Sequence, residues 1–166
     1  ILTGCGVGEI SHGGYSQIAK VKKEFLVKSP KTISTKQAMI LGTAGFTSLL
    51  CAFAIKAREE ILLGEKINEV LVTGATGGVG TVAIMVLSKL GYKVTAVTGK
   101  LDQADTLKKL GATNIIDRKE YEGEPKLLSK GLWDGVVDTV GGNILAHAIS
   151  QTKHSGIVAA CGNAGG

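Results

Sequence analysis

The segment Val70–Gly80 constrains the fold more than any other part of the chain. It begins as an apolar run, passes through a glycine-rich loop at 74–80 and continues directly into a segment with apolar residues at helical spacing. These residues are Val79, Val82, Ala83, Val86, Leu87 and Leu90. A strand, a glycine loop and a helix in this order let backbone amides approach a pyrophosphate, so the segment predicts a dinucleotide-binding fold.

The loop fits the dinucleotide template G-x-G-x-x-G in two of its three glycines. Gly77 and Gly80 stand at the second and third glycine positions, and Ala75 stands at the first. In the template, the second glycine allows the backbone to approach the pyrophosphate and the third allows the helix to pack on the strand. The alternative interpretation is an ordinary strand-to-helix turn in which the glycines serve packing alone.

The end of the next expected strand, Lys93–Val97, indicates which dinucleotide would bind. NAD-binding proteins place an Asp or Glu here, about 20 residues after the loop, on the ribose 2′-hydroxyl. This chain has Thr98, Gly99 and Lys100 instead, and a hydroxyl, an open amide and an ammonium favour a 2′-phosphate. We therefore expect NADPH (NADP) as the cofactor. The alternative makes Lys100 a solvated surface residue and lets Asp102 reach the ribose.

The composition fits a soluble α/β enzyme domain. At 166 residues, of which 44% are hydrophobic, the chain can form one well-cored domain and a smaller piece. The net charge of +5 suits an anionic ligand, but the cations form no basic stripe, so we expect no nucleic acid as a partner. The longest apolar run, Ala44–Ile55, is too short to span a bilayer, so we expect no membrane association.

The three cysteines indicate a reducing compartment. Cys5, Cys51 and Cys161 are odd in number, far apart and without the spacing of metal ligands or of a CxxC motif. We therefore expect reduced, mostly buried thiols and a cytoplasmic location.

Most of the chain alternates strands with helices. Strands are expected at 70–73, 94–97, 113–116, 135–138 and 156–160, and helices at 79–90, 102–110, 124–130 and 142–151. This alternation predicts a parallel sheet covered on both faces, an α/β Rossmann fold of the doubly wound type. The expected strand order is 3-2-1-4-5, with the ligand at the switch point between strands one and four. We assign residues 34–166 to this domain, whose sixth strand is missing from the sequence.

Residues 1–33 have a different character. They are rich in glycine and β-branched residues, with an expected turn at Gly13-Gly14 and an expected strand at Tyr15–Val21. A helical stretch from a cap at Ser34 or Thr35 through Ile40, and a second helix at Gly45–Glu59, should follow. Because the N-terminal piece cannot form a core alone, we expect the chain to be a fragment of a longer enzyme.

Several segments together resemble one enzyme superfamily. They are Gly13–Gln17, Ala38–Thr47, Gly74–Gly80, Asp138–Gly142 and Ala159–Gly166, and they occur in this order and approximate spacing in medium-chain dehydrogenases/reductases. The resemblance covers essentially the whole chain and is greatest to the acrylyl-CoA reductase and quinone oxidoreductase branch. It implies a zinc-free, NADPH-dependent reductase of activated double bonds, with a GroES-like catalytic domain, here represented by 1–33, and a Rossmann domain. Such enzymes are usually homodimers.

The resemblance also implies which residues contact the cofactor. Residues 76–79 would face the pyrophosphate, Thr98–Lys100 and Arg118 would surround the 2′-phosphate, and Asn163 would lie near the nicotinamide through its backbone. Close relatives have Arg in place of Lys100 and usually Leu in place of Asn163. The expected cofactor-binding residues are Thr43, Thr76, Gly77, Gly78, Val79, Gly80, Thr98, Gly99, Lys100, Arg118 and Asn163.

Metal and catalytic residues are not expected within this chain. Zinc-dependent members of the superfamily place a Cys ligand where Thr43 stands here, so we predict no metal. Thr43 either lines the nicotinamide cleft or caps the helix that starts at Gly45. The resemblance places the family's tyrosine and other cleft residues upstream of Ile1, so the catalytic residues remain unknown.

Two other functions fit part of the sequence. A short-chain dehydrogenase would share the loop Thr73–Gly80, but that class needs a Tyr-x-x-x-Lys pair, which this chain lacks. A nicotinamide-sensing protein could keep the fold without turnover, and the sequence alone does not separate it from an enzyme.

Overall fold

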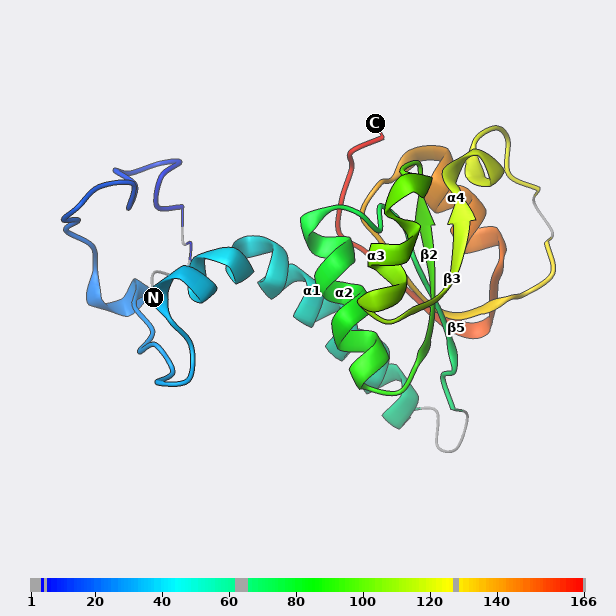
Figure 1. Ribbon diagram of the computed structural model, residues 1–166, viewed down its shortest axis with the longest axis horizontal. Helices are drawn as coiled ribbons and strands as arrows, with labels where there is room; N and C mark the ends of the chain where they lie inside the picture. The colour runs from blue at the N-terminus through cyan, green and yellow to red at the C-terminus, as the bar shows by residue number, and fades with distance from the viewer. Residues whose placement is uncertain (1–3, 5, 62–65, 127–128, 166) are drawn as a thin grey trace. The chain divides into compact units, whose positions relative to one another are not determined.

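The computed structural model describes residues 4, 6–61, 66–126 and 129–165 (Figure 1). The chain divides into two compact units, Ile1–Thr43 and Ala44–Gly166. The boundary between them falls inside one long helix, α1 (Thr35–Ile61).

The second unit is built on a five-stranded parallel sheet. Its strands are β1 (Glu69–Val72), β2 (Lys93–Thr98), β3 (Ala112–Asp117), β4 (Trp133–Asp138) and β5 (Thr152–Ala160). Their order is β3-β2-β1-β4-β5, and all four neighbouring pairs are parallel. The expected Rossmann order is therefore confirmed. Because these strands are parallel, the loops that follow β1, β2 and β4 lie at the same edge of the sheet. The loop after β1 lies between the other two, since β1 lies between β2 and β4.

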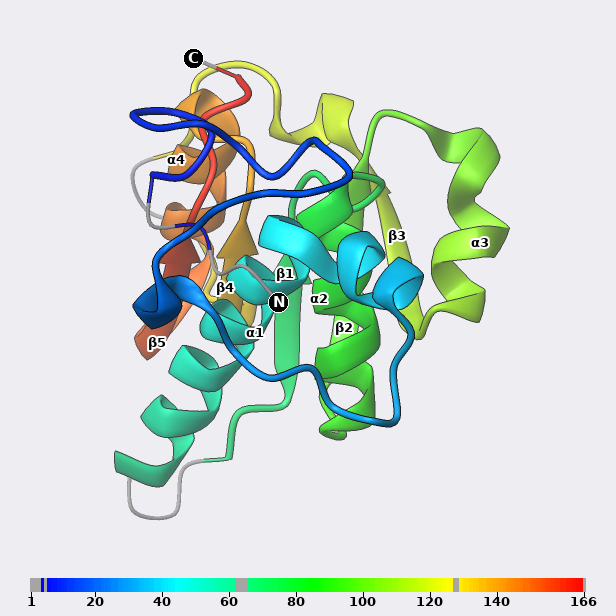
Figure 2. The same ribbon diagram turned by 90° about the vertical axis from the view of Figure 1, so that its left-hand side faces the viewer.

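Apolar residues on both sides of the strands explain the two covered faces. Side chains alternate along a strand, so Val70 and Val72 of β1 join one core cluster while Leu71 joins the other. The first cluster packs against α1, α2 (Gly78–Lys89) and α3 (Ala104–Lys109). The second packs against α4 (Gly142–Ser150) and the short helix η3 (Arg118–Tyr121). Figures 1 and 2 show α2 and α3 on one side of the sheet and α4 on the other.

Helix α1 contains a break where two helices were expected. Gly42 has φ 44° and ψ −152°, which no residue inside a helix adopts, so α1 consists of two helical segments. At its start, the amide of Gln37 donates to Ser34 Oγ at 3.2 Å and the amide of Ser34 donates to Gln37 Oε1 at 2.8 Å. This reciprocal pair identifies Ser34, rather than Thr35, as the cap.

Helix α1 is as apolar as a membrane-spanning helix or as the core helix of a soluble protein. By length and composition alone the helix could cross a membrane, a test that core helices of soluble proteins also pass. The part after the break has five buried residues, Gly45, Ser48, Cys51, Ala52 and Ile55, and the last three belong to the core of the second unit.

Two expected elements are wrong. The described part of 124–130 is not helical, because Gly123 takes φ 105° and Pro125 follows it; residues 127 and 128 lie outside the description. The strand expected at Tyr15–Val21 does not form either. Tyr15 and Ile18 are fully or almost fully exposed, at 105% and 91%, and the described residues of the first unit offer this segment no strand to pair with.

Candidate functional site

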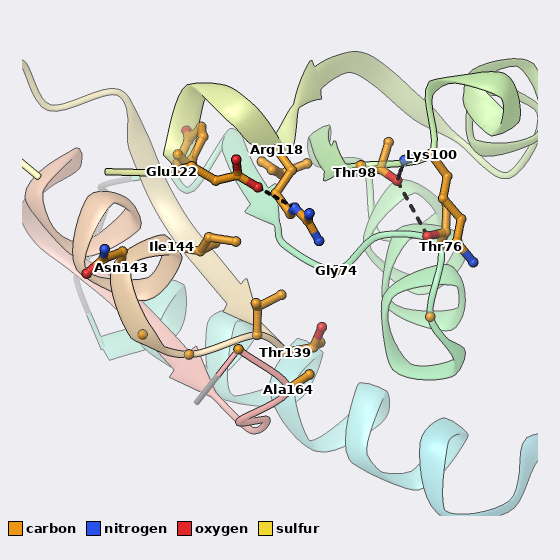
Figure 3. A pocket seen from close by; sticks show the side chains of 18 of the residues that line it. Gly74, Thr76, Thr98, Lys100, Arg118, Glu122, Thr139, Asn143, Ile144 and Ala164 are labelled. Carbon is orange, nitrogen blue, oxygen red and sulfur yellow. Dashed lines mark hydrogen bonds and ion pairs between the residues drawn. The ribbon is translucent and has the colours of Figure 1, made fainter. Parts of the chain in front are cut away.

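A cavity of about 890 Å³ opens at the carboxyl end of the sheet (Figure 3). Its walls come from the loops after β1, β2, β3 and β4 and from the segment after β5. In open α/β sheets this edge is where ligands bind, at the switch point that β1 and β4 form here. The lining residues are Gly74, Thr76, Gly77, Val97, Thr98, Gly99, Lys100, Arg118, Tyr121, Glu122, Gly123, Thr139, Val140, Gly141, Gly142, Asn143, Ile144, Ala164 and Gly165.

The glycine loop makes its tight turn at Gly74 and not at Ala75. Gly74 has φ 58°, and a β-carbon there would collide with the side chain of Thr139. The turn closes through the amide of Gly77, which donates to the Gly74 carbonyl at 2.9 Å, while the amide of Ala75 donates to the Val97 carbonyl at 3.1 Å. The role of the first template glycine, the tight turn, thus belongs to Gly74, one position before Ala75.

The start of α2 presents free backbone donors next to this turn. Gly77 is the N-cap, and no side chain among the described residues caps this end. The amide of Thr81 donates to the Gly77 carbonyl at 3.0 Å, so the amides of Gly78, Val79 and Gly80 precede the first intrahelical bond. The first turn carries no acidic side chain, and the helix dipole is positive at this end. An anion is the ligand that this end favours.

Gly80 serves packing. A β-carbon on Gly80 would lie 2.5 Å from the Gly74 carbonyl oxygen and 2.7 Å from Cα of Ala75. The residue is buried and outside the cavity lining. This close approach holds α2 against the end of β1, as the third template glycine requires.

Two cations and two hydroxyls surround the end of β2. The amide of Lys100 donates to Thr98 Oγ1 at 3.0 Å, and Thr98 Oγ1 lies 3.4 Å from Thr76 Oγ1. A β-carbon on Gly99 would lie 3.4 Å from the guanidinium carbon of Arg118, so the guanidinium group packs directly over this glycine. Figure 3 shows Thr76, Thr98 and Lys100 grouped on one side of the cavity.

Arg118 already has one carboxylate partner in the cavity. Its Nε donates to Glu122 Oε1 at 2.8 Å, four residues further along the chain, and both side chains are about half exposed. Because Nε is only one of the five guanidinium donors, the terminal nitrogens can still contact an anion over Gly99. Glu122 thus orients Arg118 through Nε and leaves the terminal nitrogens of the guanidinium group available to an anion.

A buried carboxylate ties the opposite wall together. Asp138, at the end of β4, is fully buried and accepts from Thr73 Oγ1 at 2.5 Å and from the amide of Gly141 at 2.8 Å. Thr139 adds two bonds to Thr73: its amide donates to Thr73 Oγ1 and its hydroxyl donates to the Thr73 carbonyl, both at 3.1 Å. These bonds fix the loops after β1 and β4 at a constant separation.

Tyr121 is the phenol in the cavity wall, and it is held neutral. Burial raises the pKa of Tyr121 to about 12. Its hydroxyl donates to Gln151 Oε1 at 2.7 Å, and Trp133 Nε1 donates to the same oxygen at 3.0 Å. The phenol is therefore protonated at neutral pH, and its proton is directed toward Gln151.

The structure brings most of the predicted cofactor residues together. Thr76, Gly77, Thr98, Gly99, Lys100 and Arg118 line the cavity. Gly78, Val79 and Gly80 follow directly in α2, and a β-carbon on the lining residue Gly141 would lie 2.8 Å from Asn163 Oδ1. Thr43 belongs to the first unit. Asp102, the alternative ribose ligand, lies in the short helix η2 (Leu101–Gln103) and outside the lining.

Sequence reasoning missed the wall formed by residues 139–144. The motif after β4 was recognised only as part of the family resemblance. Strand order gave the available signal: in the order 3-2-1-4-5, the loop after strand four must face the loop after strand one. No motif in the segment 121–123 indicated that it would line the cavity.

Comparison with known proteins identifies the family. A family model described as zinc-binding dehydrogenase matches residues 78–166, which is more than half of the chain. The chain belongs to this family. The match and the relatives described next confirm the resemblance to medium-chain dehydrogenases/reductases.

Two curated relatives match the chain along its whole length. "Acrylyl-CoA reductase AcuI" of Ruegeria pomeroyi is 49% identical over 167 residues, and "Putative quinone oxidoreductase YhfP" of Bacillus subtilis is 45% identical over 167 residues. Each match covers 100% of this chain and 50% of the relative. The chain therefore spans about half the length of the curated relatives it matches.

Solved structures agree with the fold. The yhdH oxidoreductase from Salmonella enterica, crystallised in complex with NADP, superposes with a TM-score of 0.91 at 47% identity, over 99% of this chain and 50% of that one. The Bacillus subtilis protein yhfP, crystallised with NAD bound, superposes with a TM-score of 0.88 at 43% identity, over 97% of this chain and 48% of that one.

The family description raises the question of zinc, and the described residues do not fit such a site. No group of three or more His, Cys, Asp or Glu side chains within the described ranges could hold a metal ion. A structural zinc site takes four such ligands, and a catalytic site takes three.

Proposed function

We propose that this chain forms the cofactor-binding part of an NADPH-dependent oxidoreductase, with the dinucleotide in the cavity at the carboxyl end of the sheet. The observation that carries the proposal is the cluster of Thr98, Lys100 and Arg118 around the exposed backbone of Gly99. An acidic residue would occupy this place in an NAD-binding protein. The relative crystallised with NADP supports the same cofactor.

The cofactor would extend across the cavity from the end of β2 to the segment after β5. The 2′-phosphate would lie against Thr98, Gly99, Lys100 and Arg118, where the two cations supply charge-assisted hydrogen bonds. The pyrophosphate would lie against Thr76 and Gly77 and the first amides of α2, those of Gly78, Val79 and Gly80.

The nicotinamide end of the site is proposed from the remaining lining residues. It would lie against the loop 139–144 and the segment after β5, with the backbone of Asn163 close by and Thr43 as a candidate from the first unit. Thr139 and Gly141 are fixed in place by Asp138 and Thr73, so this wall is rigid before a ligand arrives. A preformed wall limits the orientations of the ring and therefore the face from which hydride leaves.

The bound cofactor would supply a hydride, either to an activated C=C bond such as that of acrylyl-CoA or a related enoyl thioester, or to a quinone. The residues of this chain bind and orient the reactants. We do not assign Tyr121 as the proton donor, because its hydroxyl donates to Gln151 in this structure. We place the catalytic residues outside the cavity walls described here.

Cofactor selectivity provides the first test. Charge-assisted hydrogen bonds contribute about 1.5–3 kcal/mol each, so NADPH should bind about 10- to 150-fold more tightly than NADH for each contact with the 2′-phosphate. Titration of the protein with both cofactors, followed by nicotinamide fluorescence, measures this ratio. Lys100→Met should reduce it, and Lys108→Met, on α3 outside the cavity lining, is the matched control. Equal affinities for the two cofactors would refute the proposed role of the cluster.

Turnover separates an enzyme from a sensor. Consumption of NADPH with acrylyl-CoA, or with a simple quinone, identifies the substrate class. Tight NADPH binding with neither substrate reduced by a longer protein that contains this chain would favour the non-catalytic alternative.

The domain organisation belongs to the same proposal. We assign 1–33 to a GroES-like catalytic domain and 34–166 to the cofactor domain of a cytoplasmic homodimer. The 166-residue chain alone should turn over poorly, because relatives of this family are about twice as long. Gel filtration and a comparison of turnover between this chain and a longer protein that contains it test these assignments.

A further inference from the structure

The part of α1 that belongs to the second unit runs along β5 in the opposite direction to the strand. A β-carbon on Gly135 would lie 3.4 Å from the side chain of Ile55, and Gly135 pairs with Ile157 of β5. Further along the helix, Arg58 Nε donates to the carbonyl of Ser155, earlier in the strand, at 3.1 Å. Residues that come earlier in α1 therefore lie beside residues that come later in β5.

This arrangement brings two cysteines together that are far apart in the sequence. Cys51 lies one helical turn before Ile55, and Cys161 follows directly after β5. The side chain of Cys161 lies close enough to the Cys51 thiol to contribute to the rise of its pKa. Cys51 is buried and Cys161 is exposed, which corrects the expectation of mostly buried thiols; Cys5 lies outside the described residues. The pair is thus open to solvent on the Cys161 side.

We propose that Cys51 and Cys161 form a reversible disulfide when the protein meets a peroxide, and that this disulfide displaces the segment 161–165 at the cavity. The Cys161 thiolate attacks one oxygen of hydrogen peroxide, the O–O bond breaks, and Cys161 sulfenic acid and hydroxide form. The sulfur of Cys51 then attacks the sulfenic sulfur, the S–S bond forms, and water leaves with the thiol proton. In total, two thiols and one hydrogen peroxide give one disulfide and two waters.

The two thiols have different roles because their surroundings differ. Burial, with the neighbouring Cys161 as a further cause, raises the pKa of Cys51 to about 12. Cys51 therefore stays protonated at neutral pH and does not react first, since the thiolate is the nucleophile. Oxidation converts the Cys161 thiolate to a neutral sulfenic acid. This change removes the charge of Cys161, which is one of the causes that raise the pKa of Cys51.

The link to the cavity rests on the function proposed above. Cys161 Sγ donates to the carbonyl of Asp138 at 3.3 Å, and four residues on, the amide of Gly165 donates to the carbonyl of Val140 at 2.7 Å. An S–S bond is about 2.05 Å long, shorter than any non-bonded contact between two sulfur atoms. Because Cys51 is buried in the core, the Cys161 sulfur turns toward it and gives up its bond to the Asp138 carbonyl, which the amide of Cys161 also contacts at 2.9 Å. The lining residues that follow move with it, and NADPH binds more weakly.

Mass spectrometry of the peroxide-treated protein without reductant tests the disulfide. The expected product is a peptide containing Cys51 linked to one containing Cys161, which dithiothreitol reverses. In Cys51→Ser the sulfenic acid lacks its partner, so oxidation of Cys161 should proceed to the sulfinic acid and resist dithiothreitol. Cys161→Ser should form no link. Absence of the linked peptide in the folded wild-type protein, or a link to Cys5 in place of Cys51, would overturn the proposal.

NADPH titration before and after peroxide tests the coupling. Affinity should fall on oxidation and recover with dithiothreitol in the wild-type protein, and it should not change in Cys161→Ser. A linked peptide with unchanged NADPH affinity would overturn the coupling. Failure of the reduced wild-type protein to bind NADPH would instead refute the proposed function, because formation of the disulfide does not depend on the cofactor.

Discussion

Gly77 is the N-cap of α2 and Gly80 lies in its first turn, three positions on, and the structure predicts opposite consequences for the same substitution. At Gly80 a β-carbon would lie 2.5 Å from the Gly74 carbonyl oxygen, a backbone atom that cannot rotate away. At Gly77 the shortest such distance is 3.2 Å, and φ of −79° suits any residue. Gly80→Ala should therefore damage the fold, whereas Gly77→Ala should damage the ligand site alone.

The magnitudes follow from these distances. To accept a β-carbon at Gly80, the start of α2 must move by about an ångström, and overpacking of this kind costs about 1–3 kcal/mol. For a domain of this size the melting temperature should fall by about 2–12 °C. Alanine at Gly77 gains about 0.4–1 kcal/mol from the unfolded chain and loses a similar amount as a poorer N-cap, so the melting temperature should stay within about 2 °C.

Cofactor titration completes the comparison. The added methyl group at Gly77 separates the pyrophosphate from the amides of α2, and losing one charge-assisted hydrogen bond weakens binding by about 10- to 150-fold. Thermal melting without cofactor and NADPH titration of both variants measure the two effects. A Gly77→Ala protein that melts and binds NADPH like the wild type would show that the loop is only a structural turn.

Three further substitutions test other parts of the site and of the fold. Asp138→Ala leaves Thr73 and the amide of Gly141 without their buried acceptor, so chemical denaturation should show a loss of about 2–6 kcal/mol, at about 1–3 kcal/mol for each donor. Lys100→Met should weaken NADPH binding while leaving NADH binding unchanged, and the steeper salt dependence for NADPH than for NADH in the wild type should become smaller, with the rest due to Arg118. Burial opposes ionisation of Asp134, but hydrogen bonds from backbone amides and a lysine outweigh it and lower its pKa below 3.8 in the folded state. Its stabilising effect is therefore present above that pH and lost as the pH falls below it, so Asp134→Asn should reduce stability at pH 7 and flatten the acid limb of a stability curve.

The order of the sheet could be predicted because its signals are local. Each strand is an apolar run bounded by turns, and the single glycine loop at 74–80 fixes which strand is first. The elements that failed depended on what lies beside them in space. Tyr15–Val21 has the residues of a strand but no partner strand in the described part of its unit, and the segment at 124–130 has helix-forming residues around Pro125 and next to Gly123.

The candidate site was predictable on one wall only. The end of β2 is read directly from Thr98–Lys100, because a missing acidic residue is visible in the sequence. Glu122 was not foreseen, since its contact with Arg118 depends on the short helix η3, which the sequence pattern did not predict. The meeting of Cys51 with Cys161 also depends on a packing direction, that of α1 along β5, which no sequence spacing records.

The bonds between Thr73 and Asp138 carry a consequence for how the protein reaches its native state. They join residues 65 positions apart, so neither wall of the cavity is complete until β4 has docked beside β1. Contacts of such long sequence separation close late, because the loop between them must lose its entropy first. During refolding, β1, β2 and β3 should therefore form before the protein becomes able to bind cofactor. A ligand added early then stabilises only molecules that have finished the slow docking step, and acts as a reporter of completed folding.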